Sequence, residues 1–116
     1  DAYNSNKSGF KAALDTLAMF QELRILMTPG MVELGDEQYE ENKEVGVYAA
    51  DKCDYAVLVG KEQTKPIQDG LMQAGFMPSR MIVVDTLQEG FQMVSAIPNE
   101  RQKVILIEND LPDSYS

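Results

Sequence analysis

The sequence contains no histidine and a single cysteine, Cys53. Without histidine, neither a Ser-His-Asp nor a Cys-His triad can form, and histidine cannot act as a general base or as a metal ligand. One cysteine excludes an internal disulfide and a cysteine-ligated zinc site. Because no histidine is present to activate it, Cys53 is expected to be a small buried hydrophobic residue.

Basic residues are also scarce, since 10 Lys and Arg stand against 19 Asp and Glu, which gives a formal charge of −9. A nucleic-acid or anionic-membrane surface needs a basic footprint, so neither partner is expected. No apolar run approaches the length of a membrane span, and no signal peptide precedes Asp1. These absences predict a cytoplasmic protein that does not insert into a membrane.

Two nucleotide-binding motifs are missing as well. The stretch Gly60-Lys61-Glu62 has neither the glycine spacing of a P-loop nor the Ser or Thr after the lysine, and no G-x-G-x-x-G occurs. A receiver-type phosphoacceptor would need an aspartate directly after the central strand, where Val59 is followed by Gly60. We therefore expect no catalytic residue and no metal site in this chain.

What is present is an alternation of helical patterns with short apolar runs. The runs are apolar throughout, which is typical of strands buried on both faces of a parallel sheet. At 116 residues, residues 1–116 fit one domain. We predict a three-layer α/β/α Rossmann-like domain with a mainly parallel sheet. The predicted strands are 24–27, 55–59, 81–84 and 104–107, and the predicted helices are 9–21, 36–52, 64–74 and 86–97.

Local signals refine these elements. Asp36 and Thr64 are predicted to cap their helices, Thr86 and Glu89 have capping-box spacing, and Pro98 should end the last helix. Residues 1–8 look like a polar turn before the first helix. The side chains expected to pack inward include Tyr39, Val45, Ala49, Leu87, Phe91, Val94 and the methionines Met19, Met27, Met72, Met77 and Met81.

Two segments carry possible chemistry. The first segment combines Asp1, Tyr3, Asn4 and Asn6 ahead of a helix, and these residue types suit a nucleotide. The carboxylate could bind the ribose hydroxyls, the tyrosine ring could stack on the base, and the amides could bind phosphate. The alternative is a turn whose asparagines cap the helix. The second is the loop 30–35 after the first strand, where ligands of open α/β sheets usually bind; its alternative is a strand-to-helix turn that needs glycine.

Taken together, these motifs resemble the C-terminal domain of the Mur ligases, most closely the MurF type, UDP-N-acetylmuramoyl-tripeptide–D-alanyl-D-alanine ligase. The resemblance rests on D-A-Y-N-S-N, K-A-A-L at 11–14, G-M-V-E-L-G at 30–35 and V-L-V-G-K at 57–61. It covers almost the whole chain. The first predicted element is a helix, whereas a domain of this class usually begins with a strand. We therefore expect the native protein to extend upstream of Asp1.

The resemblance implies the C-terminal part of an ATP-dependent, ADP-forming amide ligase of peptidoglycan precursor synthesis. ATP and Mg²⁺ would be held mainly by a separate upstream ATPase domain, beside a UDP-sugar-binding domain, and the isolated domain would be inactive. Asp1, Tyr3, Asn4 and Asn6 would touch the nucleotide. The loops carrying Gly30, Met31, Glu33, Asn109 and Asp110 would face the substrates, UDP-muramoyl peptide and D-alanyl-D-alanine.

The chain departs from the family pattern at three places. Lys7 replaces a common proline, Asn42 replaces a common histidine, and the acidic stretch 108–113 replaces K-G-S-R after the last strand. The acidic stretch would suit a cationic amine, or it is a divergent surface tail. Two alternatives therefore remain: a Mur-ligase relative using another amine, and a non-catalytic nucleotide-binding or interaction module with the same fold.

Overall fold

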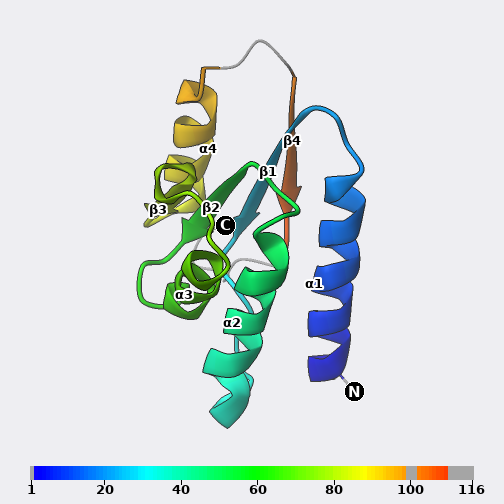
Figure 1. The fold of residues 1–116 in the computed structure, drawn as a ribbon. Coiled ribbons are helices and arrows are strands. Elements are labelled where there is room, and N and C mark those ends of the chain that lie inside the picture. Colours follow the sequence, from blue (N-terminus) through cyan, green and yellow to red (C-terminus); the bar gives the residue numbers. More distant parts are fainter. Residues whose placement is uncertain (1, 99–101, 110–116) are drawn as a thin grey trace.

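The computed structural model describes residues 2–98 and 102–109, with side chains from residue 7 onward. Helices and strands alternate along the chain, as the sequence predicts (Figure 1). The helices are α1 (Ala2–Ala18), α2 (Gln38–Ala49), α3 (Lys65–Gln73) and α4 (Leu87–Ala96), with short 3-10 turns at Gly35–Glu37 and Pro78–Arg80. The strands are β1 (Leu23–Thr28), β2 (Tyr55–Val59), β3 (Met81–Val84) and β4 (Lys103–Ile107).

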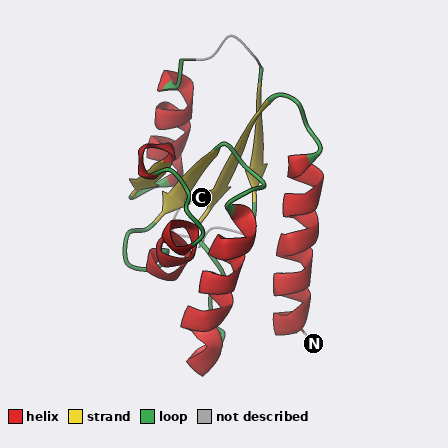
Figure 2. Ribbon diagram, in the orientation of Figure 1, coloured by secondary structure: helices red, strands yellow, loops and turns green. Residues whose placement is uncertain are grey.

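The four strands form one sheet in the order β3-β2-β1-β4, and every neighbouring pair is parallel. Figure 2 shows helices on both sides of this sheet. The prediction of a three-layer α/β/α domain with a parallel sheet is therefore confirmed. Because all strands run the same way, their carboxyl ends meet at one edge, and the loops that follow them gather there.

Two apolar clusters hold the layers together, one on each face of the sheet. On one face, α1, α2 and α3 pack through residues such as Phe10, Leu14 and Ile67 against Leu26 and Leu58. On the other face, α4 packs through Val94 and Ile97 against Ile25, Met27 and Val57. Three helices thus cover one face and a single helix covers the other.

Helix α1 begins earlier than predicted. Residues 2–8 are helical, whereas the sequence suggested a polar turn up to Ser8. Side-chain contacts explain the longer helix, because Lys7 Nζ lies 2.9 Å from a carboxylate oxygen of Glu41 and 3.5 Å from one of Glu44, both on α2. Lys11 is paired with Glu44 as well. The cross-helix ion pairs therefore hold the first turns of α1 against α2.

Of the three predicted N-caps, Asp36 is wrong, Thr64 has the predicted position without a capping hydrogen bond, and Thr86 is confirmed. Helix α2 starts after a 3-10 turn, its N-cap is Glu37 rather than Asp36, and no side chain caps it. Thr64 does occupy the N-cap of α3, but its hydroxyl donates to the carbonyl of Gly60 instead of capping. Thr86 is a true cap, since its Oγ1 accepts the N–H of Glu89 at 3.1 Å.

Replacing Thr86 with alanine is expected to lower the free energy of unfolding by about 1 kcal/mol, the usual cost of losing an N-cap hydroxyl. Urea unfolding of Thr86→Ala and Thr86→Ser measures the effect. The serine variant keeps the accepting oxygen and should stay close to wild type. Equal losses in both variants would contradict a capping role.

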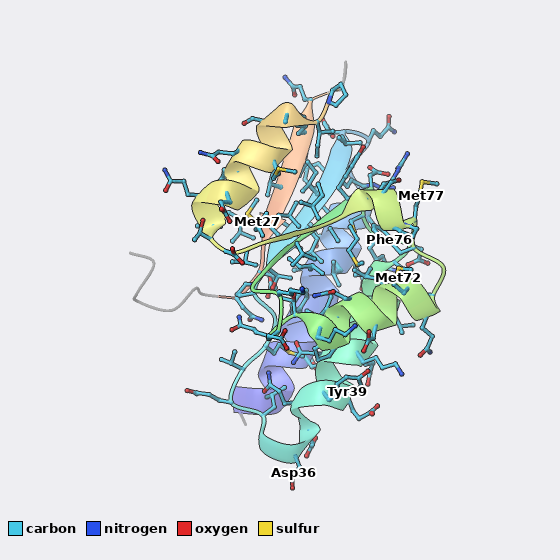
Figure 3. All side chains as sticks on the ribbon, turned by 90° about the vertical axis from the view of Figure 1, so that its left-hand side faces the viewer. Met27, Asp36, Tyr39, Met72, Phe76 and Met77 are labelled. Atoms are coloured by element: carbon cyan, nitrogen blue, oxygen red, sulfur yellow. The ribbon has the colours of Figure 1, made fainter. Side chains whose placement is uncertain are left out.

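Several predicted core side chains lie at the surface. Met19, Met72 and Met77 are 81%, 45% and 56% exposed, whereas Met27 is fully buried. Figure 3 labels the side chains of Met27, Met72 and Met77. Tyr39 is exposed, and its hydroxyl donates to Asp69. On α4, Phe91 is exposed because Gly90 takes the inward position above Met27 and Val57. The inward positions of this helix are Leu87, Gly90 and Val94, and Ile97 packs on the same side directly after the helix ends.

Cys53 lies in the core, as the sequence predicts. It is 5% exposed, and burial, helped by Asp54, raises the pKa of its thiol to about 12. We expect its alkylation at pH 8 to be slower in the folded protein than in the urea-unfolded protein by on the order of a hundredfold, because the thiolate is the reactive form. A thiol reagent followed by mass spectrometry measures both rates, and equal rates would contradict the burial of this thiol.

Candidate functional site

The loops after β1, β2 and β4 meet at the carboxyl edge of the sheet, where a ligand of this fold class binds. Their meeting point is the backbone of Pro29, Gly30 and Met31. These residues are buried, although they belong to a loop. Buried backbone polar groups need partners, and in this loop the partners are side chains from several elements.

Thr28 joins the loop after β1 to the loop after β4. It is fully buried, and its hydroxyl accepts the N–H of Gly30 at 2.9 Å while donating to the carbonyl of Glu108 at 2.8 Å. Asn109 completes the connection, because its Nδ2 donates to the carbonyl of Gly30 at 3.1 Å. Gln63, from the loop after β2, donates to the carbonyl of Pro29 at 2.7 Å. The three loops are thereby fastened to one segment of backbone.

Asn42 fastens the same segment from α2. It is fully buried; its Oδ1 accepts the N–H of Met31 at 2.9 Å, and its Nδ2 donates to the carbonyls of Met31 at 3.0 Å and of Gln38 at 2.8 Å. Gly30 adopts φ +86, and a Cβ there would lie 3.1 Å from the Asn42 Oδ1. Glycine is therefore required for both backbone conformation and space.

The outer part of the loop faces solvent. Glu33 is exposed, and its backbone adopts φ 64, a value that residues other than glycine rarely adopt. The next residue, Leu34, donates its N–H to Gln38 Oε1 at 3.1 Å, and Gln38 Nε2 also donates to the carbonyl of Met31. Gln38 therefore holds the backbone on both sides of the loop tip, while the side chain of Glu33 is exposed to solvent.

Glu108 contributes a second carboxyl group at this edge. Its backbone N–H donates to the carbonyl of Met27 at 3.1 Å, which continues the β1–β4 ladder by one residue. Burial raises the pKa of its carboxyl above the ordinary value. A positive group placed beside Glu108 would favour its ionised form.

The predicted site residues fall into two groups. The structure brings Gly30, Met31 and Asn109 together by the contacts above, and Glu33 lies in the same loop. Asp110 lies outside the described residues.

Asp1 also lies outside the described residues, and Tyr3, Asn4 and Asn6 are described only in their backbone, as part of α1. This helix runs opposite to the strands, so its first turns lie toward the carboxyl edge of the sheet (Figure 1).

Apart from Asn109, sequence reasoning missed the polar side chains that hold the loop. Asn42 had a signal, because it stands three and seven residues before the inward-facing Val45 and Ala49 and thus on the buried stripe of α2. A polar residue on a buried stripe needs a hydrogen-bond partner. Gln63 and Thr28 carried no comparable signal, since their partners are 34 and 80 residues away.

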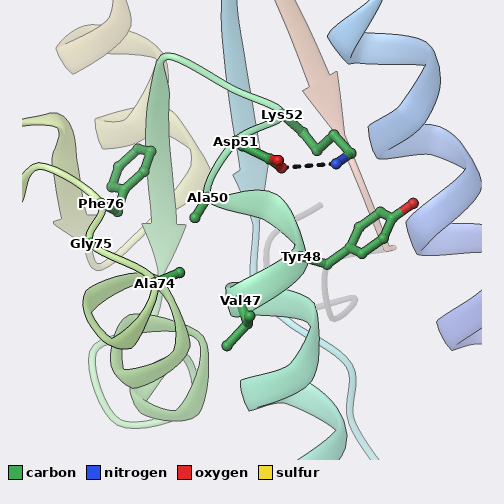
Figure 4. A pocket seen from close by; sticks show the side chains of 8 residues that line it. All are labelled: Val47, Tyr48, Ala50, Asp51, Lys52, Ala74, Gly75 and Phe76. Carbon is green, nitrogen blue, oxygen red and sulfur yellow. Dashed lines mark hydrogen bonds and ion pairs between the residues drawn. The ribbon is translucent and has the colours of Figure 1, made fainter.

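A surface hollow of about 460 Å³ lies elsewhere, between the carboxyl-terminal ends of α2 and α3 (Figure 4). Its charged residues are already paired: Lys52 Nζ lies 2.8 Å from Asp51 and 4.4 Å from the ring centroid of Tyr48. Because the helices run opposite to the strands, this hollow lies toward the amino edge of the sheet. It is therefore separate from the loop site.

Within 2–98 and 102–109, no cluster of three or more His, Cys, Asp or Glu side chains could hold a metal ion. No helix in the described part of the chain has the length and apolar character to span a membrane.

The fold and the loop contacts together define a Rossmann-like α/β domain in which the loops after β1, β2 and β4 gather at one sheet edge. Residues 1–108 match the family described as Mur ligase, glutamate ligase domain. The chain belongs to this family.

Among solved structures, the chain is similar to MurF from Acinetobacter baumannii, with a TM-score of 0.71 and 18% sequence identity. The match covers 88% of this chain and 22% of the MurF chain, so the chain spans about a fifth of the protein that it matches. At this identity the likeness shows the fold. No curated protein sequence gives a significant match.

Proposed function

We propose that this chain is the C-terminal domain of a longer ATP-dependent, ADP-forming amide ligase that works on peptidoglycan precursors in the cytoplasm. The family match over residues 1–108 carries the proposal. It is supported by the MurF fold and by the loops gathered at the carboxyl edge. The upstream part of the native chain would supply the ATPase and UDP-sugar-binding domains and would hold most of the ATP and Mg²⁺.

In this proposal the domain closes over the nucleotide and positions the incoming amine. Asp1, Tyr3, Asn4 and Asn6 would contact the adenosine and phosphates from the start of α1, where the helix N-terminus favours negative charge. The loop of Gly30, Met31 and Glu33, fastened to Asn109, would face the UDP-muramoyl peptide and D-alanyl-D-alanine, and Asp110 would join it. Catalysis would come from positioning and electrostatic stabilisation, which dominate phosphoryl transfer.

Asn4→Ala in the full native chain is expected to raise the KM for ATP about tenfold, the effect of losing a hydrogen bond to a charged phosphate. ADP release at varied ATP measures this change. Ser8→Ala is the matched control, because Ser8 is exposed one turn further along α1. An unchanged KM in a folded Asn4→Ala protein would remove Asn4 from the nucleotide site.

A second candidate is a Mur-ligase relative that uses another amine. The acidic Glu108 stands where the family has the lysine of K-G-S-R, and a cationic amine would stabilise its charged carboxylate. ADP release with a panel of neutral and cationic amines separates the two candidates. Preference for D-alanyl-D-alanine supports the MurF-like substrate, and preference for a cationic amine supports the relative.

A further inference from the structure

The loop after β1 lies in the middle of the carboxyl edge, because the sheet order places β1 between β2 and β4. Its backbone carbonyls are held from both sides. Gln63, on the loop after β2, donates its Nε2 to the carbonyl of Pro29 at 2.7 Å. Asn109, on the loop after β4, donates its Nδ2 to the carbonyl of the next residue, Gly30, at 3.1 Å. The two neighbouring loops therefore hold two consecutive residues of the central loop.

These two contacts differ from the buried ones in what they can contribute to folding. Thr28 and Asn42 are fully buried, and they accept the N–H groups of Gly30 and Met31. Gln63 is exposed and Asn109 is half-buried, so water can replace their amides at modest cost. Holding an exposed glutamine in one conformation also costs side-chain entropy. The contact of Gln63 therefore acts on the position of the loop more than on the stability of the domain.

The backbone conformation marks the same two loops. Among the residues that the structure describes, the non-glycine residues with positive φ are Glu33 at 64 and Asn109 at 72. Such conformations carry a cost, persist where surrounding contacts hold them, and cluster at ligand-binding sites. The bond from Asn109 to Gly30 is a contact of this kind, and the bonds of Gln38 hold the backbone beside Glu33. The strained residues therefore lie in the loops of the candidate site.

We propose that Gln63 and Asn109 are positioning residues, which clamp the loop after β1 for the acceptor amine. The clamp fixes the exposed Glu33 relative to Lys61 and Glu62, which are exposed on the loop after β2. An amine that binds this edge then meets a surface already in place, so less ordering is required on binding. The inference rests on the proposed function, because it takes the acceptor amine as the ligand of this edge.

Replacing each amide with a carboxylate is the first test. Gln63→Glu and Asn109→Asp keep the size of the side chain but replace the donor that faces a carbonyl with an acceptor. Aspartate also tolerates positive φ. In the native protein each substitution should raise the KM for the acceptor amine at least about tenfold and leave the KM for ATP within about twofold. ADP release at varied amine and at varied ATP measures both, with D-alanyl-D-alanine or the amine of the panel that gives the higher rate.

Gln68→Glu is the matched control, because it makes the same change of charge close by. The Nε2 of Gln68 donates to the carbonyl of Lys61 at 3.0 Å and to the hydroxyl of Thr64 at 3.2 Å, both between β2 and α3. Its KM for the amine should stay within about twofold of wild type. An equal rise in Gln63→Glu and Gln68→Glu would assign the effect to charge and overturn the clamp.

Amide exchange at Gly30 tests the clamp without catalysis. Gln63→Glu should speed exchange of the Gly30 N–H at least about tenfold, while the midpoint of urea unfolding stays close to wild type. Unchanged exchange in the folded variant would overturn the clamp, and faster exchange with an unchanged KM for the amine would overturn its role toward the amine. Failure of the proposed function looks different, because the wild-type protein would then release no ADP with any amine. The role toward the amine would fall with it, and exchange at Gly30 would still decide whether the clamp exists.

Discussion

Gly70→Ala is expected to destabilise the domain by about 3 kcal/mol, the upper part of the range for overpacked cores. Gly70 on α3 and Gly46 on α2 bring the two helix backbones into contact. A Cβ on Gly70 would lie 2.2 Å from the carbonyl oxygen of Lys43 and 2.9 Å from the nitrogen of Val47. These are backbone atoms, so the helices must move apart. Urea unfolding measures the loss.

The matched control is Gly9→Ala on α1, where a Cβ would meet nothing within 4 Å. It should raise the free energy of unfolding by up to about 1 kcal/mol, because alanine favours the helix over glycine. Opposite signs for the two substitutions would identify backbone contact as the cause. A neutral or stabilising Gly70→Ala would contradict the close approach of α2 and α3.

Asn42→Ala is expected to have the second large effect, a loss of about 3 kcal/mol. It removes three hydrogen bonds, two of them buried, and leaves the buried N–H of Met31 without its acceptor. The loop 29–31 would lose its attachment to α2. Urea unfolding gives the global loss, and amide exchange at Met31 reports the local one.

Gln38→Ala is the control for Asn42, because Gln38 contacts the same Met31 carbonyl from a half-buried position. Water can replace its amide, so its loss should be about 1 kcal/mol. If Asn42→Ala cost no more than Gln38→Ala, the loop would not depend on the buried amide. Asn42 would then not be the residue that holds the loop to α2.

Much of this fold can be predicted from the sequence. The strands are short apolar runs bounded by glycine and polar residues, and helical spacing separates them, so the α/β class and the parallel sheet follow. The strand order could not be predicted, because it depends on which face each crossover helix covers. The early start of α1 was also missed, since its ion pairs join Lys7 to residues 34 and 37 positions away.

The loop after β1 could be predicted from the sequence, but the hydrogen bonds that hold it could not. Proline and glycine after the first strand identify the loop. The bonds that fix it come from Gln63, Asn109 and Asn42, which lie 34, 79 and 11 residues from their partners. The predicted burial of Met19 and Met77 was wrong for a related reason, because hydrophobicity alone does not show which side chains find a packing partner.

ADP release by the full native protein, supplied with ATP, Mg²⁺, UDP-muramoyl peptide and D-alanyl-D-alanine, tests the central proposal most directly. A ligase should release ADP in proportion to the amide bonds formed, and the release should depend on the UDP-muramoyl peptide. ATP binding without ADP release on any amine tested, in a folded native protein, would contradict the ligase. The chain would then be a nucleotide-binding or interaction module that shares the Mur ligase fold.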